Sequence, residues 1–261
     1  VRHTGRVHRW ATGMLLAGPE GLPPTDLPSM PKGPDCLPAY REALGDLLAQ
    51  LARHEPAQPV LTFTDRGIYC PAGDFHIDPW RPVPRALITH GHSDHARWGM
   101  GSYLATDKAL PVIRKRLGPI TADAIPYGQT RQIGSATVSF HPAGHVPGSA
   151  QIKVTVAGET WVVSGDYKTE PDGLAEPFQP VPCHAFISEC TFGLPIFRWE
   201  PQPRVMDQIA RWWSANAAAG KTSILGAYSF GKAQRLLAGL PAIGPILTHG
   251  AVEEMTQTLR D

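Results

Sequence analysis

Short apolar runs, separated by glycine, proline and aspartate, dominate residues 60–170. Such runs predict β-strands, here at 60–63, 67–69, 75–77, 86–89, 137–141, 151–156 and 160–164. One helix is predicted among them, at 108–117, because it ends in the basic residues Arg114, Lys115 and Arg116 and is stopped by Gly118-Pro119. This part of the chain is therefore predicted to consist mainly of strands.

The pattern changes after Glu189. Residues 202–219 and 232–240 are predicted as helices, and short apolar runs predict strands at 223–227 and 244–248. Strands that alternate with helices are typical of a parallel α/β unit. The last segment, 252–261, consists of helix-forming residues with no capping glycine or proline, which we interpret as a truncated C-terminus.

The N-terminal segment has a different composition. Residues 18–38 are rich in proline, glycine and short polar side chains, which indicates a linker. Residues 37–54 place apolar side chains on one helical face and predict an amphipathic helix. These changes divide the chain into an extension at 1–59 and two further regions at 60–190 and 191–261.

Charge and cysteine content bear on where the protein is found, but they do not show whether it binds nucleic acid. The formal net charge is +1, so any affinity for a polyanion must come from a local basic patch or from bound metal. The four cysteines form no Cys-x-x-Cys pair, which favours a reducing environment. No apolar stretch approaches the ~20 residues of a membrane span. We therefore expect a cytoplasmic protein without a membrane segment.

Four metal-capable side chains crowd into the six residues that follow the strand predicted at 86–89: His90, His92, Asp94 and His95. Imidazoles two residues apart on a turn can converge on one ion, while Asp94 and His95 project toward a second position. The alternative is a surface loop that is rich in histidine by chance, but histidines are usually scattered singly. The spacing predicts a binuclear metal centre.

Two later positions extend this set. His145 lies on a glycine-flanked turn after a predicted strand, where its ring can approach a metal ion. A lone histidine is more often a hydrogen-bonded structural residue, so His145 carries weight only together with the cluster. Asp166 follows the strand predicted at 160–164, and a carboxylate there can bridge two cations.

The order Thr-His-Gly-His-Ser-Asp-His at 89–95, then Gly-His145, then Gly-Asp166 resembles the metallo-β-lactamase superfamily over residues 60–170. The segment Ile-Ser-Glu-Cys-Thr-Phe-Gly at 187–193 resembles the acidic first motif of its β-CASP subgroup, whose members cut DNA or RNA. Segments 63–74, 77–80 and 189–197 resemble bacterial DNA ligase-associated exonucleases. The resemblance implies an α/β fold, with an αββα sandwich at 60–190 and a partial β-CASP-like α/β domain at 191–261.

The resemblance also implies roles for individual residues. By position, His90, His92 and His145 would hold one metal ion, Asp94 and His95 the other, with Asp166 between them. Asp78 would brace the metal loop, and Glu189 would orient a ligand histidine. Imidazole and carboxylate ligands without thiolate suit zinc, with manganese as the alternative.

The implied activity is hydrolysis of DNA phosphodiester bonds by an exonuclease in DNA repair, with two divalent ions as cofactors and Asp94 and Glu189 as catalytic residues. The substrate would be single-stranded or end-containing DNA, and a link to a DNA ligase or helicase rests on the resemblance alone. The nearest rival is an RNA-processing nuclease of the same subgroup. A thioester or lactam hydrolase shares the histidine cluster but would not need the Glu189 motif.

The segment Gly-Ala-Tyr-Ser-Phe-Gly-Lys at 226–232 has the spacing of a phosphate loop. Ala233 stands where a nucleotide-binding loop needs serine or threonine for magnesium, which argues against an NTP site. We interpret this turn, with Ser229 and Lys232, as a helix N-terminus that presents amides to a backbone phosphate. The alternative is a plain βα turn with a solvated lysine. Further basic candidates for facing DNA are Arg97, Lys168 and Arg235.

The resemblance also implies two downstream motifs that this sequence lacks. β-CASP nucleases normally carry a Ser-x-His-Ala-Asp-like segment and a later histidine, and neither appears before Asp261. His249 is the one histidine in the final stretch, and its context does not match. A third function therefore stays open, an inactive truncated module that binds metal or nucleic acid.

Overall fold

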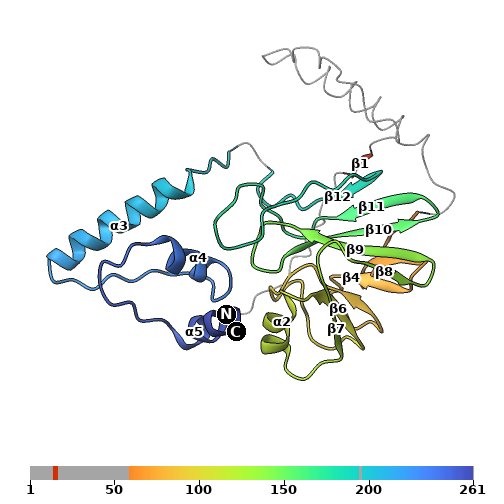
Figure 1. Ribbon diagram of the computed structural model, residues 1–261, viewed down its shortest axis with the longest axis horizontal. Helices are drawn as coiled ribbons and strands as arrows, with labels where there is room; N and C mark the ends of the chain where they lie inside the picture. Colours follow the sequence, from red (N-terminus) through yellow and green to blue (C-terminus); the bar gives the residue numbers. More distant parts are fainter. Residues whose placement is uncertain (1–13, 17–58, 194–195, 261) are drawn as a thin grey trace, which may run out of the picture.

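The computed structural model describes residues 14–16, 59–193 and 196–260, whose strands form two six-stranded sheets (Figure 1). Sheet A has the order β1-β12-β11-β10-β9-β8, and sheet B runs from β2 to β7 in chain order. Sheet A comprises β1 (Met14–Leu16), β8 (Thr130–Ile133), β9 (Ala136–Pro142), β10 (Ala150–Val156), β11 (Glu159–Val163) and β12 (Ala185–Ile187). Sheet B comprises β2 (Thr62–Thr64), β3 (Gly67–Cys70), β4 (Phe75–Ile77), β5 (Ala86–Leu87), β6 (Tyr103–Thr106) and β7 (Ala122–Ile125).

The two sheets share one apolar core. Phe75 and Leu87 of sheet B and Phe140 and Ile152 of sheet A belong to it, and each is fully buried. Burial of side chains of this size contributes about 1.5–3 kcal/mol each. On β10, Ile152 lies opposite both Phe140 of β9 and Val163 of β11, which sets the register of sheet A. The result is a mixed α/β sandwich of two sheets, as the sequence predicts.

All seven strands predicted between 60 and 170 are present, at β2 to β5 and β9 to β11. The predicted helix is also confirmed as α2 (Leu110–Leu117), and its Ile113 packs with Ile88 and Ala105 against sheet B. Five strands were not predicted: β1, β6, β7, β8 and β12. Each has only three or four residues, which is too short for the alternation that marks a strand to stand out. Strand β1 lies within the extension predicted at 1–59 and pairs with β12.

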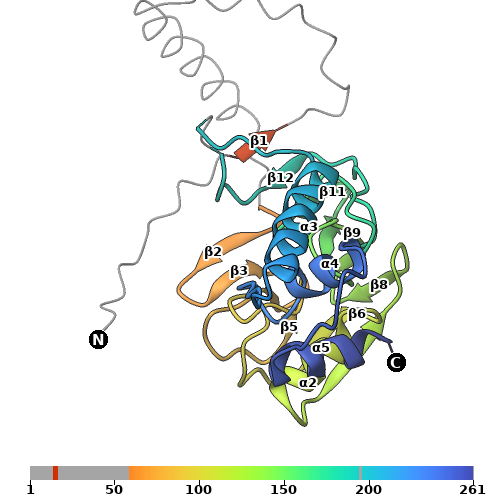
Figure 2. The same cartoon turned by 90° about the vertical axis from the view of Figure 1, so that its left-hand side faces the viewer.

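Three helices follow the sandwich: α3 (Gln202–Ala218), α4 (Lys232–Gly239) and α5 (Gly250–Arg260). Helix α5 lies beside α2, as Figures 1 and 2 both show. Val112 of α2 and Met255 of α5 share a small apolar cluster with Val146 and Phe230. This cluster joins the C-terminal helices to the loops of the sandwich.

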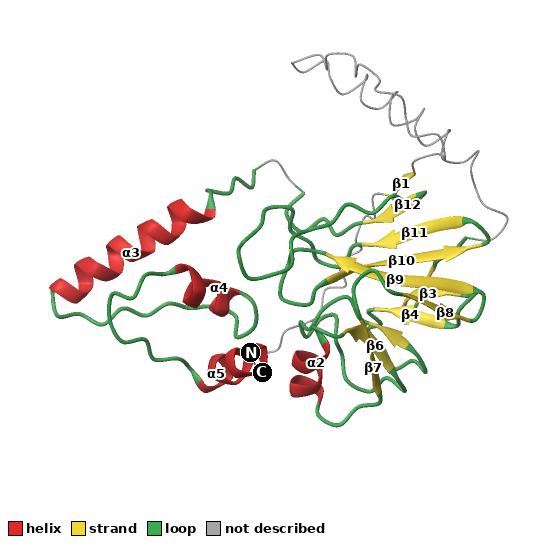
Figure 3. Ribbon diagram, in the orientation of Figure 1, coloured by secondary structure: helices red, strands yellow, loops and turns green. Residues whose placement is uncertain are grey.

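The strands predicted at 223–227 and 244–248 are wrong, because both segments are extended without a strand partner (Figure 3). Their apolar side chains remain in solvent, with Ile224 86% and Leu247 97% exposed. A strand forms only where another strand accepts and donates its backbone hydrogen bonds. Within the described residues, the C-terminal part therefore consists of helices and extended connections.

The helix predicted at 37–54 lies outside the described residues, and the division at 59/60 and 190/191 stays a prediction. Among the residues that the structure describes, no helix is both long enough and apolar enough to cross a membrane.

Candidate metal centre

The loops that follow β5 and β11 and the turn between β9 and β10 meet at one end of the sandwich. They bring together His90, His92, His145 and Asp166, with one ligand atom of each within 4.8 Å of the others. Because these residues are up to 76 positions apart in the numbering, the sandwich and not the local sequence assembles them. We therefore treat this group as a candidate metal site.

The spacing of the donor atoms fits one small cation. His92 Nδ1 lies 3.0 Å from His90 Nε2 and 3.2 Å from His145 Nε2. Asp166 Oδ2 lies 3.8 Å from His90 Nε2 and 3.6 Å from His145 Nε2. Ligands about 2.0–2.1 Å from a tetrahedral ion are about 3.3 Å apart. Three imidazoles and one carboxylate at these separations therefore suit a zinc-like ion.

A second set of donors shares Asp166. His95 Nε2 lies 3.2 Å from Asp166 Oδ1, the other oxygen of that carboxylate, and 3.8 Å from Asp94 Oδ2. The Asp94 side chain is 69% exposed and lies at the solvent edge of this second set. One carboxylate thus faces two neighbouring sets of ligand atoms, an arrangement that can hold two cations side by side.

Asp78 and Thr89 orient His95 and His90 through hydrogen bonds to the ring nitrogens that face away from the cluster. Asp78 accepts hydrogen bonds from the Thr89 backbone N–H at 2.8 Å, from the Thr89 hydroxyl at 2.5 Å and from His95 Nδ1 at 2.7 Å. The Thr89 hydroxyl has one proton and directs it to Asp78, so at 3.1 Å its oxygen accepts from His90 Nδ1. His90 and His95 therefore both present Nε2 to the cluster. Such outer partners set the tautomer of ligand histidines.

Burial and neighbouring charges shift the pKa values of the clustered histidines in opposite directions. Burial, reinforced by the neighbouring imidazoles His95, His145 and His92, lowers the pKa of His90 well below its usual value. Burial also lowers the pKa of His145 to about 4, which keeps this imidazole neutral and ready to bind a cation. Burial opposes protonation of His95 too, but the Asp78 and Asp166 carboxylates raise its pKa to about 11. A metal ion at His95 would have to displace this proton.

Unusual backbone conformations bring the loops close together. Asp78 has a φ of +44°, which is uncommon outside glycine. Gly165, directly before Asp166, has a φ of +57°, and a Cβ at this position would lie 2.6 Å from Thr89 Cβ. Only glycine therefore allows the Asp166 loop to approach the histidine loop this closely.

The C-terminal segment also contacts the cluster. The Phe230 carbonyl oxygen lies 3.3 Å from His92 Nε2, and the Phe230 ring packs edge-on against the His92 ring. When Nε2 donates to this carbonyl, Nδ1 is left free to bind a cation. From α2, Arg116 donates to the carbonyls of Gly91, at 2.7 Å, and Ala96, at 3.4 Å, and so holds both ends of the histidine loop.

Neither contact was predicted from the sequence. A backbone carbonyl at position 230 carries no signal in its residue type. Arg116 stood out in the sequence only as part of a basic run at the end of a helix. The amino-acid pattern therefore offers no means of identifying either partner.

Glu189 contacts the backbone beside Asp166. Its Oε1 accepts from the backbone N–H of Tyr167 at 3.3 Å, and its own N–H contacts the Ser164 hydroxyl at 3.4 Å. No hydrogen bond joins its carboxylate to an imidazole within the described part of the chain. Glu189 supports the backbone next to Asp166 because β12 runs parallel to β11 and ends at the same edge, and its role in orienting a ligand histidine stays a prediction.

The predicted phosphate-binding residues lie near this region but make internal contacts. Lys232 Nζ stands 5.3 Å from the centre of the Tyr228 ring, and the Ser229 carbonyl accepts from Gln234. Lys168 Nζ pairs with Asp172 at 2.9 Å, and Arg235 approaches the same carboxylate at 3.9 Å.

Arg97 and His249, the remaining residues singled out in the sequence, are not members of the metal-capable group. Arg97 Nε donates to the Asp94 carbonyl at 3.1 Å. His249 Nδ1 accepts from the Ala251 N–H at the start of α5, and His249 is not a member of the metal-capable group.

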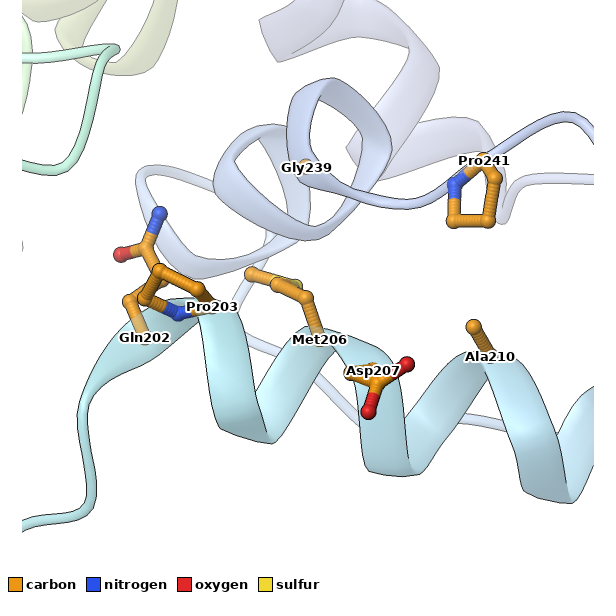
Figure 4. Close-up of a pocket in the computed structure, with 7 residues that line it drawn as sticks. All are labelled: Gln202, Pro203, Met206, Asp207, Ala210, Gly239 and Pro241. Atoms are coloured by element: carbon orange, nitrogen blue, oxygen red, sulfur yellow. The ribbon is translucent and has the colours of Figure 1, made fainter.

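A groove of about 410 Å³ lies elsewhere, between α3 and the end of α4 (Figure 4). Met206, Asp207 and Gly239 are among the residues that line it, and none of the candidate metal ligands does so. The groove and the candidate metal centre are therefore separate features of the molecule.

Comparison with known proteins places these features in context. No protein-family model matches the chain. It is 31% identical over 196 residues to "Probable DNA ligase" of Opitutus terrae, an alignment that covers 73% of this chain and 19% of that protein. It is 31% identical over 147 residues to Ribonuclease TTHA0252 of Thermus thermophilus, covering 46% of this chain and 34% of the relative. The chain thus spans a fifth to a third of the length of these curated relatives.

Among solved structures, a metallo-β-lactamase of Cronobacter sakazakii matches 42% of this chain and 58% of its own, at 19% identity and a TM-score of 0.29. The order of the histidine and aspartate motifs, the paired sheets that carry them and the sequence relatives agree with one another. The chain belongs to the metallo-β-lactamase superfamily, within its β-CASP nuclease group.

Proposed function

We propose that this chain is a metal-dependent nuclease that hydrolyses DNA phosphodiester bonds, acting as an exonuclease in DNA repair. The observation that carries the proposal is the position of Asp166, whose two oxygens face two sets of ligand atoms. Two divalent cations, zinc or manganese, would supply the Lewis acidity that activates water at neutral pH and would offset the charge of the phosphodiester.

The residues of the chain have distinct parts in this reaction. His90, His92 and His145 would hold one cation as neutral imidazoles, and His95 and Asp94 would hold the second. Asp94, which is exposed at the rim of the cluster, would also orient the attacking water. Asp78 and Thr89 keep Nε2 of His90 and His95 directed inward. Rigid orientation of ligands in this way lowers the cost of reaching the transition state.

DNA is the favoured substrate because the alignment with the protein named a DNA ligase covers 73% of this chain, against 62% for a relative named an endoribonuclease and 46% for the ribonuclease. RNA is the alternative, since several relatives are named ribonucleases or endoribonucleases. Of the basic candidates, Lys232 and Arg97 are exposed and could meet a phosphate, whereas Asp172 neutralises Lys168. A functional link to a DNA ligase or a helicase stays a prediction.

Elemental analysis combined with digestion of labelled single-stranded DNA tests the proposal. We expect two metal ions per chain and end-directed digestion, both lost on treatment with a chelator. Asp94→Ala is expected to abolish digestion. Asp123→Ala, at an exposed aspartate of β7 that pairs with Arg131, serves as the matched control and is expected to digest DNA like the wild type.

Two other results would change the assignment. A strong preference for RNA of matched sequence would contradict the choice of DNA and favour an RNA-processing nuclease. Metal binding without digestion of either strand would show that this chain is an inactive module of its family.

A further inference from the structure

Three aromatic side chains form an exposed cluster in the segment between β12 and α3. The ring centres of Phe192 and Phe197 are 5.1 Å apart, and those of Phe192 and Trp199 are 4.9 Å apart. The Phe197 and Trp199 planes are nearly parallel, at 8°. The three residues are 55%, 40% and 71% exposed, respectively. Contiguous apolar surface of this kind marks an interaction site more often than chance exposure.

The aromatic segment is tied at both ends to the loop that carries Asp166. Before the cluster, Glu189 Oε1 accepts from the Tyr167 N–H at 3.3 Å. After the cluster, Gln202 Nε2 donates to the Asp172 carbonyl at 3.0 Å. Residues on both sides of the aromatic cluster are therefore anchored to the loop that carries Asp166. A ligand held by the aromatic rings would be held next to this loop.

The charge around the cluster favours an anionic ligand. Arg198 stands between Phe197 and Trp199, is exposed and forms no ion pair with any described residue. The nearby carboxylate of Glu200 is already paired with Arg204, at 3.3 Å. A free guanidinium between aromatic rings suits a strand whose bases stack and whose phosphates pair with arginine.

We propose that Phe192, Phe197 and Trp199 form a stacking platform that holds the unpaired bases of a nucleic-acid strand next to the loop of Asp166. This inference rests on the proposed nuclease function and adds residues that the metal chemistry does not involve. A base-paired end would have to fray before its bases reach the rings. The platform thus selects an unpaired strand by stacking and not by base sequence.

Binding measurements on the full chain, with divalent ions removed so that no cleavage occurs, test this inference. Fluorescence anisotropy would compare a labelled oligothymidylate with an abasic strand of equal length and charge. Trp199→Ala is expected to weaken binding of the oligothymidylate about 5- to 100-fold and to leave binding of the abasic strand unchanged. Trp199→Phe is expected to recover most of the loss.

The matched control is Trp212→Ala, at another partly exposed tryptophan that lies on α3. It is expected to bind both strands like the wild type. Equal binding of the oligothymidylate by Trp199→Ala and wild type would overturn the inference, and so would an equal loss on both strands. A lower melting temperature or an altered oligomeric state without weaker base-dependent binding would assign the cluster to packing or to a protein interface.

These results are independent of the cleavage assay. Base-dependent binding without digestion would support the platform and contradict the nuclease function. Digestion by a Trp199→Ala variant with unchanged binding would support the nuclease and contradict the platform. Oligouridylate in place of oligothymidylate shows whether the platform accepts RNA as well as DNA.

Discussion

The carbonyl oxygen of Phe230 lies 3.3 Å from Nε2 of His92, although the two residues are 138 positions apart in the chain. This contact directs Nδ1 of His92 toward His90 and His145, where it lies 3.0 and 3.2 Å from their Nε2 atoms. The C-terminal segment therefore contributes to the geometry of the metal centre without supplying a ligand. Outer partners of this kind tune metal affinity and ligand orientation.

Replacing Gly231 by alanine is expected to lower metal affinity about 10- to 100-fold, the range for loss of a ligand's outer partner. Gly231 has a φ of +87°, and a Cβ there would collide with Val146 and approach His92 Nε2 to 3.8 Å. The Phe230 carbonyl would have to move. Competition with a chelator measures the affinity. Gly226→Ala, where a Cβ meets nothing within 4 Å, is the control, and equal affinities would refute the role of this carbonyl.

Thr89→Val is expected to weaken metal binding by about tenfold or more. The change keeps the shape of the side chain but removes the hydroxyl that links Asp78 to His90. His90 then loses the acceptor that sets its tautomer. The metal content of protein dialysed at graded free-metal concentrations gives the readout. Thr155→Val, whose hydroxyl contacts only that of Thr160, should behave as wild type.

Arg116→Met is expected to reduce the free energy of unfolding by about 1–3 kcal/mol, because the half-buried carbonyls of Gly91 and Ala96 lose their charged donor. Urea unfolding of the metal-free protein measures this loss separately from metal binding. Lys115→Met, at an exposed position of the same helix whose pair with Glu254 is loose at 3.8 Å, should change stability by less than about 0.5 kcal/mol. Similar losses in both variants would mean that Arg116 acts only as a helix residue.

The free energy of unfolding is expected to fall in acid because the ion-paired carboxylates of Asp172 and Glu176 become protonated. Burial would raise the pKa of Asp172, but the Lys168 ion pair and the backbone N–H groups of Ala175 and Leu174 lower it. Burial of Glu176 is likewise outweighed by Lys108 and by the Gly148 N–H, so its pKa is also lowered. The stabilisation is present above the unfolded values of 3.8 and 4.5, and it is lost as the pH falls through the lower folded values.

Urea unfolding between about pH 7 and pH 3 measures this dependence. The double variant Asp172→Asn and Glu176→Gln should be less stable at pH 7 and should lose less stability in acid than the wild type. Glu170→Gln, in the same loop and exposed, is the control. An acid transition of the same size in the double variant would assign the effect to other carboxylates.

The sequence by itself determined the chemistry of the candidate site and most of the sandwich. His90, His92, Asp94 and His95 are adjacent in the chain, so their side-chain types and spacing were sufficient to predict a metal loop. Strands such as β9 and β10 were predictable because burial between two sheets leaves a local pattern of apolar positions. The same local pattern was misleading at 223–227 and 244–248, since apolar residues form a strand only beside a partner.

The tertiary structure alone decided which atoms face one another. Pairing of β5 with β4 places Asp78 beside Thr89. Phe230 contacts His92 and packs in the same apolar cluster as residues of α2 and α5. Glu189 supports Tyr167 because the ends of two parallel strands coincide. These relationships depend on backbone positions many residues apart, and a backbone carbonyl or N–H is present at nearly every position. Residue type therefore carries no information about which of these groups reaches the site.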